Sequence, residues 1–96
     1  MLIIMILEVV SPEATLFSGE VNSVAVPGAN GAFQVLDNHA PIVSILNPGT
    51  VKIGGKISLP EETAHHFKQQ GEETFLKLPN GGTVEMQQNK IVLLAD

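Results

Sequence analysis

The sequence predicts a small, mainly β protein whose strands pack as a sandwich or a flattened barrel. Val24 and Val26 alternate with Ser23 and Ala25, and residues 74–78 also alternate, with the period of a half-buried strand. Turn-forming residues separate these segments, for example at 27–31 and 79–82. With 96 residues, 44% of them apolar, the chain suffices for one core, so residues 1–96 are predicted to form a single domain.

The first strand is predicted over Leu2–Val9, in an opening stretch rich in Ile and Leu. A continuous apolar run of this kind is typical of a strand buried on both faces. The run is far too short to span a bilayer, which takes about 20 residues, and it lacks the basic region and cleavage site of a signal peptide. Regular alternation begins at Met5, which makes Met5 a candidate for an alternative start of the chain.

Three further strands are predicted in the first half of the chain. Leu16–Val21 forms the second strand, where Gly19 suggests a bulge. Residues 24–26 belong to the third strand and residues 33–35 to the fourth. The segment Pro27–Gly31 between them is a compact turn, with two glycines that can adopt positive φ.

The segment Leu36–Ile42 is predicted to be a loop and contains His39. Pro41 fixes its own φ, lacks an N–H and pushes the preceding residue toward extended geometry. Gly54-Gly55 is interpreted as a hairpin turn, and Gln88-Asn89 as the turn of a final hairpin. The remaining strands are predicted at Ile42–Leu46, Thr50–Ile53, Lys56–Leu59, Thr74–Leu78, 84–86 and 91–93.

One segment departs from the strand pattern and favours a short helix, at Pro60–Gly71. Proline suits a first helical position, acidic residues suit the first turn, and glycine can end a helix. Ala64 and Phe67 are three residues apart and would share one packing face. An irregular loop is the alternative interpretation.

The composition excludes several classes of function. The formal net charge is −5, there is no arginine, and the five lysines are scattered along the sequence, so neither nucleic acid nor anionic lipid is an expected partner. Cysteine is absent, which excludes disulfides, thiolate catalysis and cysteine-ligated metals. The low charged fraction, 16%, is consistent with apolar surface that a partner covers.

Few residues suggest catalysis, and no cofactor or metal is expected. His39 either contacts a partner or titrates near Asp37, or else it fixes its own turn by a backbone hydrogen bond. His65 and His66 would point about 100° apart on a helix, whereas a helical metal pair needs four-residue spacing. No Gly-x-Ser-x-Gly elbow or phosphate loop is present, so an enzyme is not predicted.

Two other functional classes remain as alternatives. A small β-sandwich module could bind a sugar or a peptide, although the chain has no Trp or Tyr for sugar stacking. A metal-dependent enzyme would have to use His39, His65 and His66.

Several motifs occur in a characteristic order along nearly the whole chain: Glu8–Glu13, Leu16–Val21, Val26–Phe33, His39–Pro41, Asn47–Gly49, Val51–Ile53, Gly81–Met86 and Asn89–Asp96. Each motif is weak by itself. The ordered set closely resembles the epsilon subunit family of bacterial rotary ATP synthases, whose mitochondrial counterpart is called delta.

The resemblance implies a β-sandwich of about ten strands, on the family pattern, and a non-catalytic central-stalk subunit. Such a subunit binds the gamma subunit and sits on the membrane-embedded c-ring, supporting the coupling of proton or sodium flow to ATP synthesis. It lies peripherally, at the cytoplasmic face of the bacterial inner membrane, without inserting into the bilayer. In the family, two loops point toward the ring and the foot of gamma, and the matching residues here are Ala29, Asn30, Gly31, Asn38, His39, Ala40 and Pro41.

Three departures from the family pattern stand out. Family members usually carry a C-terminal helical hairpin, which can inhibit ATP hydrolysis and in some cases binds ATP. This chain stops at Ala95-Asp96, where that hairpin would begin, so the inhibitory arm is expected to be absent, by nature or by removal. Asp37-Asn38 replaces a more familiar Pro-Gly, and Asn80 stands where serine is common. The segment Leu59–Gly71 resembles an insertion.

Overall fold

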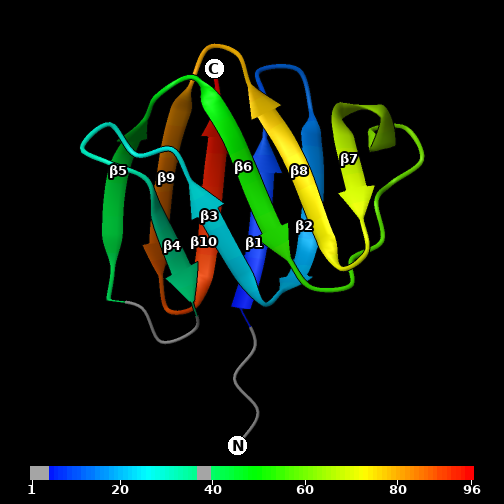
Figure 1. Cartoon of the computed structure of the whole chain (residues 1–96), viewed down its shortest axis with the longest axis horizontal. Coiled ribbons are helices and arrows are strands. Elements are labelled where there is room, and N and C mark those ends of the chain that lie inside the picture. Colours follow the sequence, from blue (N-terminus) through cyan, green and yellow to red (C-terminus); the bar gives the residue numbers. More distant parts are fainter. Residues whose placement is uncertain (1–4, 37–39) are drawn as a thin grey trace, which may run out of the picture.

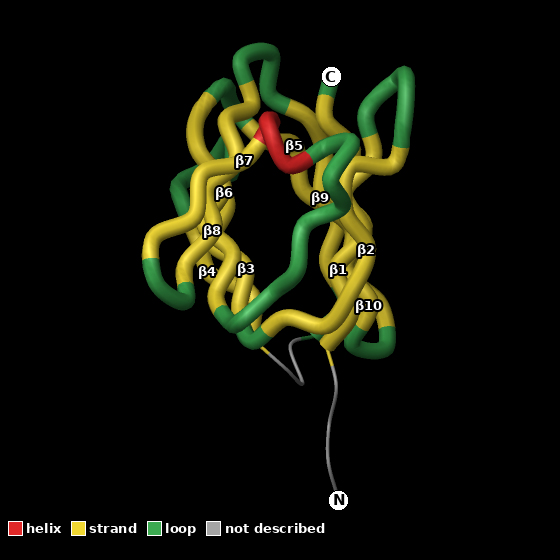
Figure 2. Tube along the Cα trace, turned by 90° about the vertical axis from the view of Figure 1, so that its right-hand side faces the viewer, coloured by secondary structure: helices red, strands yellow, loops and turns green. Residues whose placement is uncertain are grey.

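The computed structural model describes residues 5–36 and 40–96 of the chain. Within these residues, ten strands form two five-stranded sheets that lie face to face as the two layers of a sandwich (Figure 2). The strands are β1 (Met5–Val10), β2 (Thr15–Val21), β3 (Ser23–Val26), β4 (Phe33–Leu36), β5 (Ile42–Leu46), β6 (Gly49–Gly54), β7 (Phe67–Gln70), β8 (Glu73–Leu78), β9 (Gly82–Gln87) and β10 (Lys90–Ala95). A 3₁₀ turn, η1 (Ala64–His66), precedes β7. The predicted mainly β sandwich is confirmed.

The first sheet has the strand order β2-β1-β10-β9-β5, and the second sheet has the order β4-β3-β6-β8-β7. Neighbouring strands are antiparallel except for β1 and β10, which run parallel with Ile6 opposite Lys90 and Val10 opposite Leu94. Strands from the two ends of the sequence therefore lie side by side within the first sheet (Figure 1).

The core lies between the two sheets and uses alternate residues of the strands. In β1, Met5, Leu7 and Val9 point inward and are buried, whereas the residues between them are half-buried. The expectation that this strand is buried on both faces is wrong, because within the described residues only one face of the first sheet is covered by the second sheet. The strand therefore shows the alternation of a half-buried strand.

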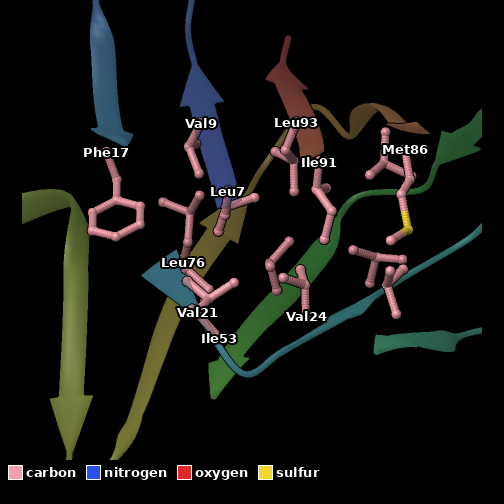
Figure 3. Packing of buried hydrophobic residues seen from close by; sticks show 14 of the residues in the cluster. Leu7, Val9, Phe17, Val21, Val24, Ile53, Leu76, Met86, Ile91 and Leu93 are labelled. Carbon is pink, nitrogen blue, oxygen red and sulfur yellow. The ribbon is translucent and has the colours of Figure 1, made fainter. Parts of the chain in front are cut away.

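Figure 3 shows how the two layers meet, with Leu7 and Leu93 of the first sheet pointing toward Val24 and Ile53 of the second. All four side chains are fully buried. Fully burying an aliphatic side chain stabilises the folded state by roughly 1.5–3 kcal/mol. The core is thus the main source of stability in a chain without disulfides.

The predicted turn at Gln88-Asn89 is confirmed, whereas the roles of the glycines predicted in other segments differ in part. Gln88 and Asn89 have φ of 53° and 60°, as a two-residue hairpin turn between β9 and β10 requires. Gly31 has a φ of 125°, whereas Gly28 is needed for space, since a Cβ there would lie 2.6 Å from the carbonyl oxygen of Gly31. The bulge expected at Gly19 is absent. The register between β1 and β2 shifts instead between Val9 and Val10.

The strand predicted at Lys56–Leu59 is not formed. β6 already has β3 on one side and β8 on the other, so no place in the sheet is left for a returning strand. The chain turns away at Gly55, whose φ is 119°. Ile57 and Leu59 instead pack half-buried against the core from outside the sheets.

The helix predicted over Pro60–Gly71 is reduced to the three residues of η1, and its second half is the edge strand β7. Tertiary contacts explain the difference. The Thr63 hydroxyl donates to the carbonyl oxygen of Leu16 in β2 at 2.7 Å, and the Gln69 amide donates to the carbonyl oxygen of Ile57 at 3.1 Å. These bonds, with the pairing of β7 to β8, hold the segment across the opening between the two sheets (Figure 2).

Candidate partner-binding surface

The turn at Pro27–Gly31 is fastened to the outer edge of β5. The Ala29 N–H donates to the carbonyl oxygen of Ile45 at 2.8 Å, and the Asn47 N–H donates to that of Pro27 at 2.8 Å. An isolated bridge between Gly28 and Leu46 completes the attachment. The turn therefore has a fixed position beside the last residues of β5 (Figure 1).

The tip of this turn is open to solvent. Ala29, Asn30 and Gly31 are all exposed, and a Cβ at Gly31 would meet no atom within 4 Å. The Gly31 N–H donates to the carbonyl oxygen of Gly28 at 3.0 Å, which closes the turn. The three predicted contact residues are thus presented on a closed, anchored turn.

The second predicted loop leads into the other end of β5. Ala40 and Pro41 are exposed and immediately precede Ile42, the first residue of that strand. Asn38 and His39 lie outside the residues that the structure describes. The structure therefore brings five of the seven predicted contact residues to the two ends of one strand.

Sequence reasoning missed the most exposed apolar side chains of this region. Val43 and Ile45 of β5 point outward and are 78% and 67% exposed. β5 is an edge strand of the first sheet and pairs with β9 on one side. The available signal was the sequence Ile-Val-Ser-Ile-Leu, which is apolar at four of five positions and so cannot bury every apolar residue in one face.

The exposed apolar character continues from β5 onto the outer face of the first sheet. Ile45 lies opposite Thr83 of β9, which lies opposite Leu94 of β10, which in turn lies opposite Val10 of β1. Leu94 is 45% exposed. We refer to the residues along this edge as the β5 surface: Ala29, Asn30, Gly31, Ala40, Pro41, Val43 and Ile45.

The β5 surface offers contact rather than chemistry. Its described side chains carry no titratable group, and in residues 5–36 and 40–96 no three His, Cys, Asp or Glu side chains gather in a way that could hold a metal ion. Nor does the described part of the chain contain a helix with the length and apolarity needed to cross a membrane. The geometry fits a surface for macromolecular docking.

His65 and His66 lie on the far side of the molecule from β5, next to β7 (Figure 1). Their ring centroids are 4.1 Å apart and the ring planes are inclined by 36°. The expectation that the two rings diverge is wrong, because it assumed a regular α-helix, whereas these residues end a 3₁₀ turn just before an extended strand.

Residues 4–96 match the family described as ATP synthase, Delta/Epsilon chain, beta-sandwich domain. The chain belongs to this family. It is 38% identical over 90 residues to the ATP synthase epsilon chain of Chlorobaculum tepidum, covering 94% of this chain and 86% of the relative. It is 36% identical to the ATP synthase epsilon chain of Desulforamulus reducens, covering 94% of this chain.

The share of each epsilon chain that this chain covers differs among the relatives. The chain spans 57% of the Desulforamulus protein and 58% of the Leptospira interrogans epsilon chain, to which it is 38% identical over 88 residues. It therefore spans little more than half the length of these two relatives.

Solved structures agree on the fold. The match to a chain of the mitochondrial ATP synthase of Euglena gracilis has a TM-score of 0.72 at 15% identity, covering 99% of this chain and 52% of that chain. The match to a chain in the central stalk and c-ring structure of the Tetrahymena thermophila mitochondrial ATP synthase has a TM-score of 0.65 at 13% identity, covering 94% and 61%. The predicted family resemblance is confirmed by the family match over residues 4–96 and by the epsilon chains.

Proposed function

We propose that this chain is a non-catalytic central-stalk subunit of a rotary ATP synthase, which links the gamma subunit to the membrane c-ring. Family membership over residues 4–96 and relatives named as ATP synthase epsilon chains support the assignment. The structural observation that carries it is the β5 surface, where exposed Val43 and Ile45 lie between the anchored Pro27–Gly31 turn and the loop end at Ala40-Pro41. An exposed apolar edge of this kind marks a docking site.

The architecture suits a mechanical rather than a chemical role. Two sheets share one close-packed core, and close-packed interiors have low compressibility and transmit strain. Torque applied at the β5 surface would therefore pass through the sandwich with little deformation. In this role the subunit supports the coupling of proton or sodium flow to ATP synthesis without converting a substrate itself.

The partner contacts are proposed on the seven residues that the family pattern indicates: Ala29, Asn30, Gly31, Asn38, His39, Ala40 and Pro41. Val43 and Ile45 extend this set, because they lie on the strand between the two loops and would be left in water without a partner. The subunit would sit peripherally at the cytoplasmic face of the bacterial inner membrane, held by gamma and the c-ring rather than by lipid.

Co-elution with the gamma subunit of the same organism tests this function. The purified chain and gamma are mixed at micromolar concentration and separated by size-exclusion chromatography, and one stable complex is expected. A Val43→Asp/Ile45→Asp variant would place two carboxylates in the interface, which should weaken the complex at least about tenfold, because burying an unpaired charge is costly.

Thr15→Asp/Ser18→Asp is the matched control, with the same change in net charge, since both residues are exposed on β2, the opposite edge strand of the same sheet. This variant should bind gamma as the original chain does. If the original chain fails to co-elute with gamma, the rotor assignment is rejected. If both variants bind gamma equally well, the β5 surface is not the interface.

A further inference from the structure

The second sheet brings together lysines that are far apart in the sequence. Lys52 of β6 and Lys68 of β7 both lie directly opposite Phe75 of β8, one on each side. Lys77 follows Phe75 by two residues and therefore points to the same outer face. Three of the five lysines thus surround one phenylalanine, in contrast to the scattered distribution seen along the sequence.

The positive charge of this group is only partly balanced. Lys52 pairs with Glu73 at 3.4 Å, but within the described residues no acidic side chain lies within salt-bridge distance of Lys68 or Lys77. Neighbouring strands are about 4.8 Å apart, so the backbones of Lys52 and Lys68 are about 10 Å apart. An anion midway between them is about 5 Å from each backbone, which is less than the Debye length of about 8 Å at physiological ionic strength. Both lysines therefore attract it.

Phe75 differs from the other phenylalanines of the chain. Phe17, Phe33 and Phe67 lie in the core or pack against it, whereas Phe75 is half-buried on the outer face of the second sheet. It contributes to a cleft of about 430 Å³ whose other lining residues include His65, His66, Phe67, Lys68 and Lys77. The cleft therefore combines an aromatic floor with a basic rim.

The histidine side of this cleft is held in place by hydrogen bonds from the segment before β7 and from β7 itself. The Thr63 hydroxyl bonds to the carbonyl oxygen of Leu16 in the other sheet, directly before η1. The Gln69 amide bonds to the carbonyl oxygen of Ile57 and to the Thr74 hydroxyl, both at 3.1 Å. The wall is thus preorganised, which reduces the entropy lost on binding.

We propose that this cleft, which we call the Phe75 cleft, binds an acidic segment of a partner protein that carries an apolar side chain between its carboxylates. The apolar side chain would cover Phe75, and the carboxylates would pair with Lys68 and Lys77. Charge complementarity argues for an acidic partner, because this local basic group lies on a chain whose net charge is −5.

Other anionic ligands fit the Phe75 cleft less well. Phosphate sites commonly use backbone N–H groups or the planar fork of arginine, but here the strand N–H groups lie in the plane of the sheet and arginine is absent. A flat lipid surface would not reach a floor that lies inside a cleft. Three lysines are also few for a nucleic acid, which requires many phosphate contacts.

A titration with a defined peptide tests this proposal. The probe is a five-residue peptide with one phenylalanine between two pairs of glutamates and with both ends blocked. Added to the ¹⁵N-labelled chain, it should cause saturable shifts of amide signals in β6, β7 and β8. A Lys68→Glu/Lys77→Glu variant should bind the peptide at least about tenfold more weakly, because two ion pairs become repulsive contacts.

Lys56→Glu/Lys90→Glu is the matched control, with the same change in net charge at two lysines outside the cleft. It should bind within about twofold of the original affinity, since distant exposed charges are screened. Phe75→Ala should also weaken binding while the thermal midpoint remains near that of the original chain.

Four results would overturn the proposal: no saturable shift at millimolar peptide, equal binding of a peptide with glutamine in place of glutamate, equal weakening by the control variant, or inorganic phosphate binding as tightly as the peptide. Residues of β7 and β8 line the Phe75 cleft, and β7 lies at the opposite side of the sandwich from β5 (Figure 1), so none of these results bears on the rotor assignment.

Discussion

Replacing Gly28 by alanine should disturb the attachment of the Pro27–Gly31 turn to β5. The added Cβ would lie 2.6 Å from the carbonyl oxygen of Gly31 and 2.8 Å from the ring of Phe33. The ring can rotate away, but the carbonyl belongs to the backbone of the turn itself. The φ of Gly28 is not positive, so the clash rather than backbone strain sets the cost.

Inserting a methyl group into a packed site typically costs about 1–3 kcal/mol. We expect Gly28→Ala to lower the free energy of unfolding by about 2 kcal/mol, near the middle of this range. In a domain of fewer than 100 residues this corresponds to a decrease in the thermal midpoint of about 8–16 °C. Urea and thermal unfolding, followed by circular dichroism, measure both quantities.

Ala29→Ser is the control for this experiment, because Ala29 is exposed at the tip of the same turn. It should change the free energy of unfolding by less than about 0.5 kcal/mol. A Gly28→Ala variant as stable as the original chain would refute the close packing of the turn against Phe33, and with it the fixed position of the turn beside β5.

Three further predictions concern other parts of the molecule. Leu93→Ala should lower the free energy of unfolding by about 2–5 kcal/mol in urea, because Leu93 is fully buried, whereas Leu94→Ala, at the 45% exposed neighbour, should cost far less; similar losses would contradict the inward and outward assignment. Thr63→Val removes the bond to Leu16 and should cost about 1 kcal/mol, with faster amide exchange in residues 56–66; unchanged exchange would show that this bond does not hold the segment. Replacing His39-Ala40-Pro41 by three glycines should reduce co-elution with gamma while most of the thermal stability remains, and an unchanged complex would argue against a contact role for this loop.

The strands were predictable where alternation and turn chemistry act locally. Residues 74–78 alternate with period two and form β8, and Gln88-Asn89 has the turn chemistry of a two-residue hairpin. The prediction failed at Lys56–Leu59, although Ile57 and Leu59 also alternate. An extended segment that packs against the edge of a core shows the same alternation of apolar and polar residues as a strand. Residues 56–59 are excluded from the sheet only because β3 and β8 already pair with the two sides of β6.

The helix predicted over Pro60–Gly71 failed for a related reason. Its terminal residues favour a helix locally, but Thr63 and Gln69 form hydrogen bonds to residues distant in sequence. Tertiary contacts commonly override weak helix propensity. A single sequence does not reveal such partners.

For the candidate surfaces too, local features were predictable from the sequence, whereas features that depend on strand order and register were not. Sequence patterns predicted an exposed turn at Pro27–Gly31, because glycine and asparagine mark it locally. The exposure of Val43 and Ile45 follows from the edge position of β5, which is a property of the strand order. Likewise, Lys52 and Lys68 meet around Phe75 only through the register of β6, β8 and β7.

The parallel pairing of β1 with β10 has a consequence for biosynthesis. Ile6 is matched with Lys90, and Val10 with Leu94, so each contact joins residues 84 positions apart (90 − 6 and 94 − 10). A growing polypeptide cannot form the middle of this sheet until the codons for β10 have been translated and that strand has left the ribosome. Contacts between such distant residues also slow folding. Until then β1 exposes apolar residues that aggregate readily, so chaperone protection should matter most while the nascent chain is incomplete.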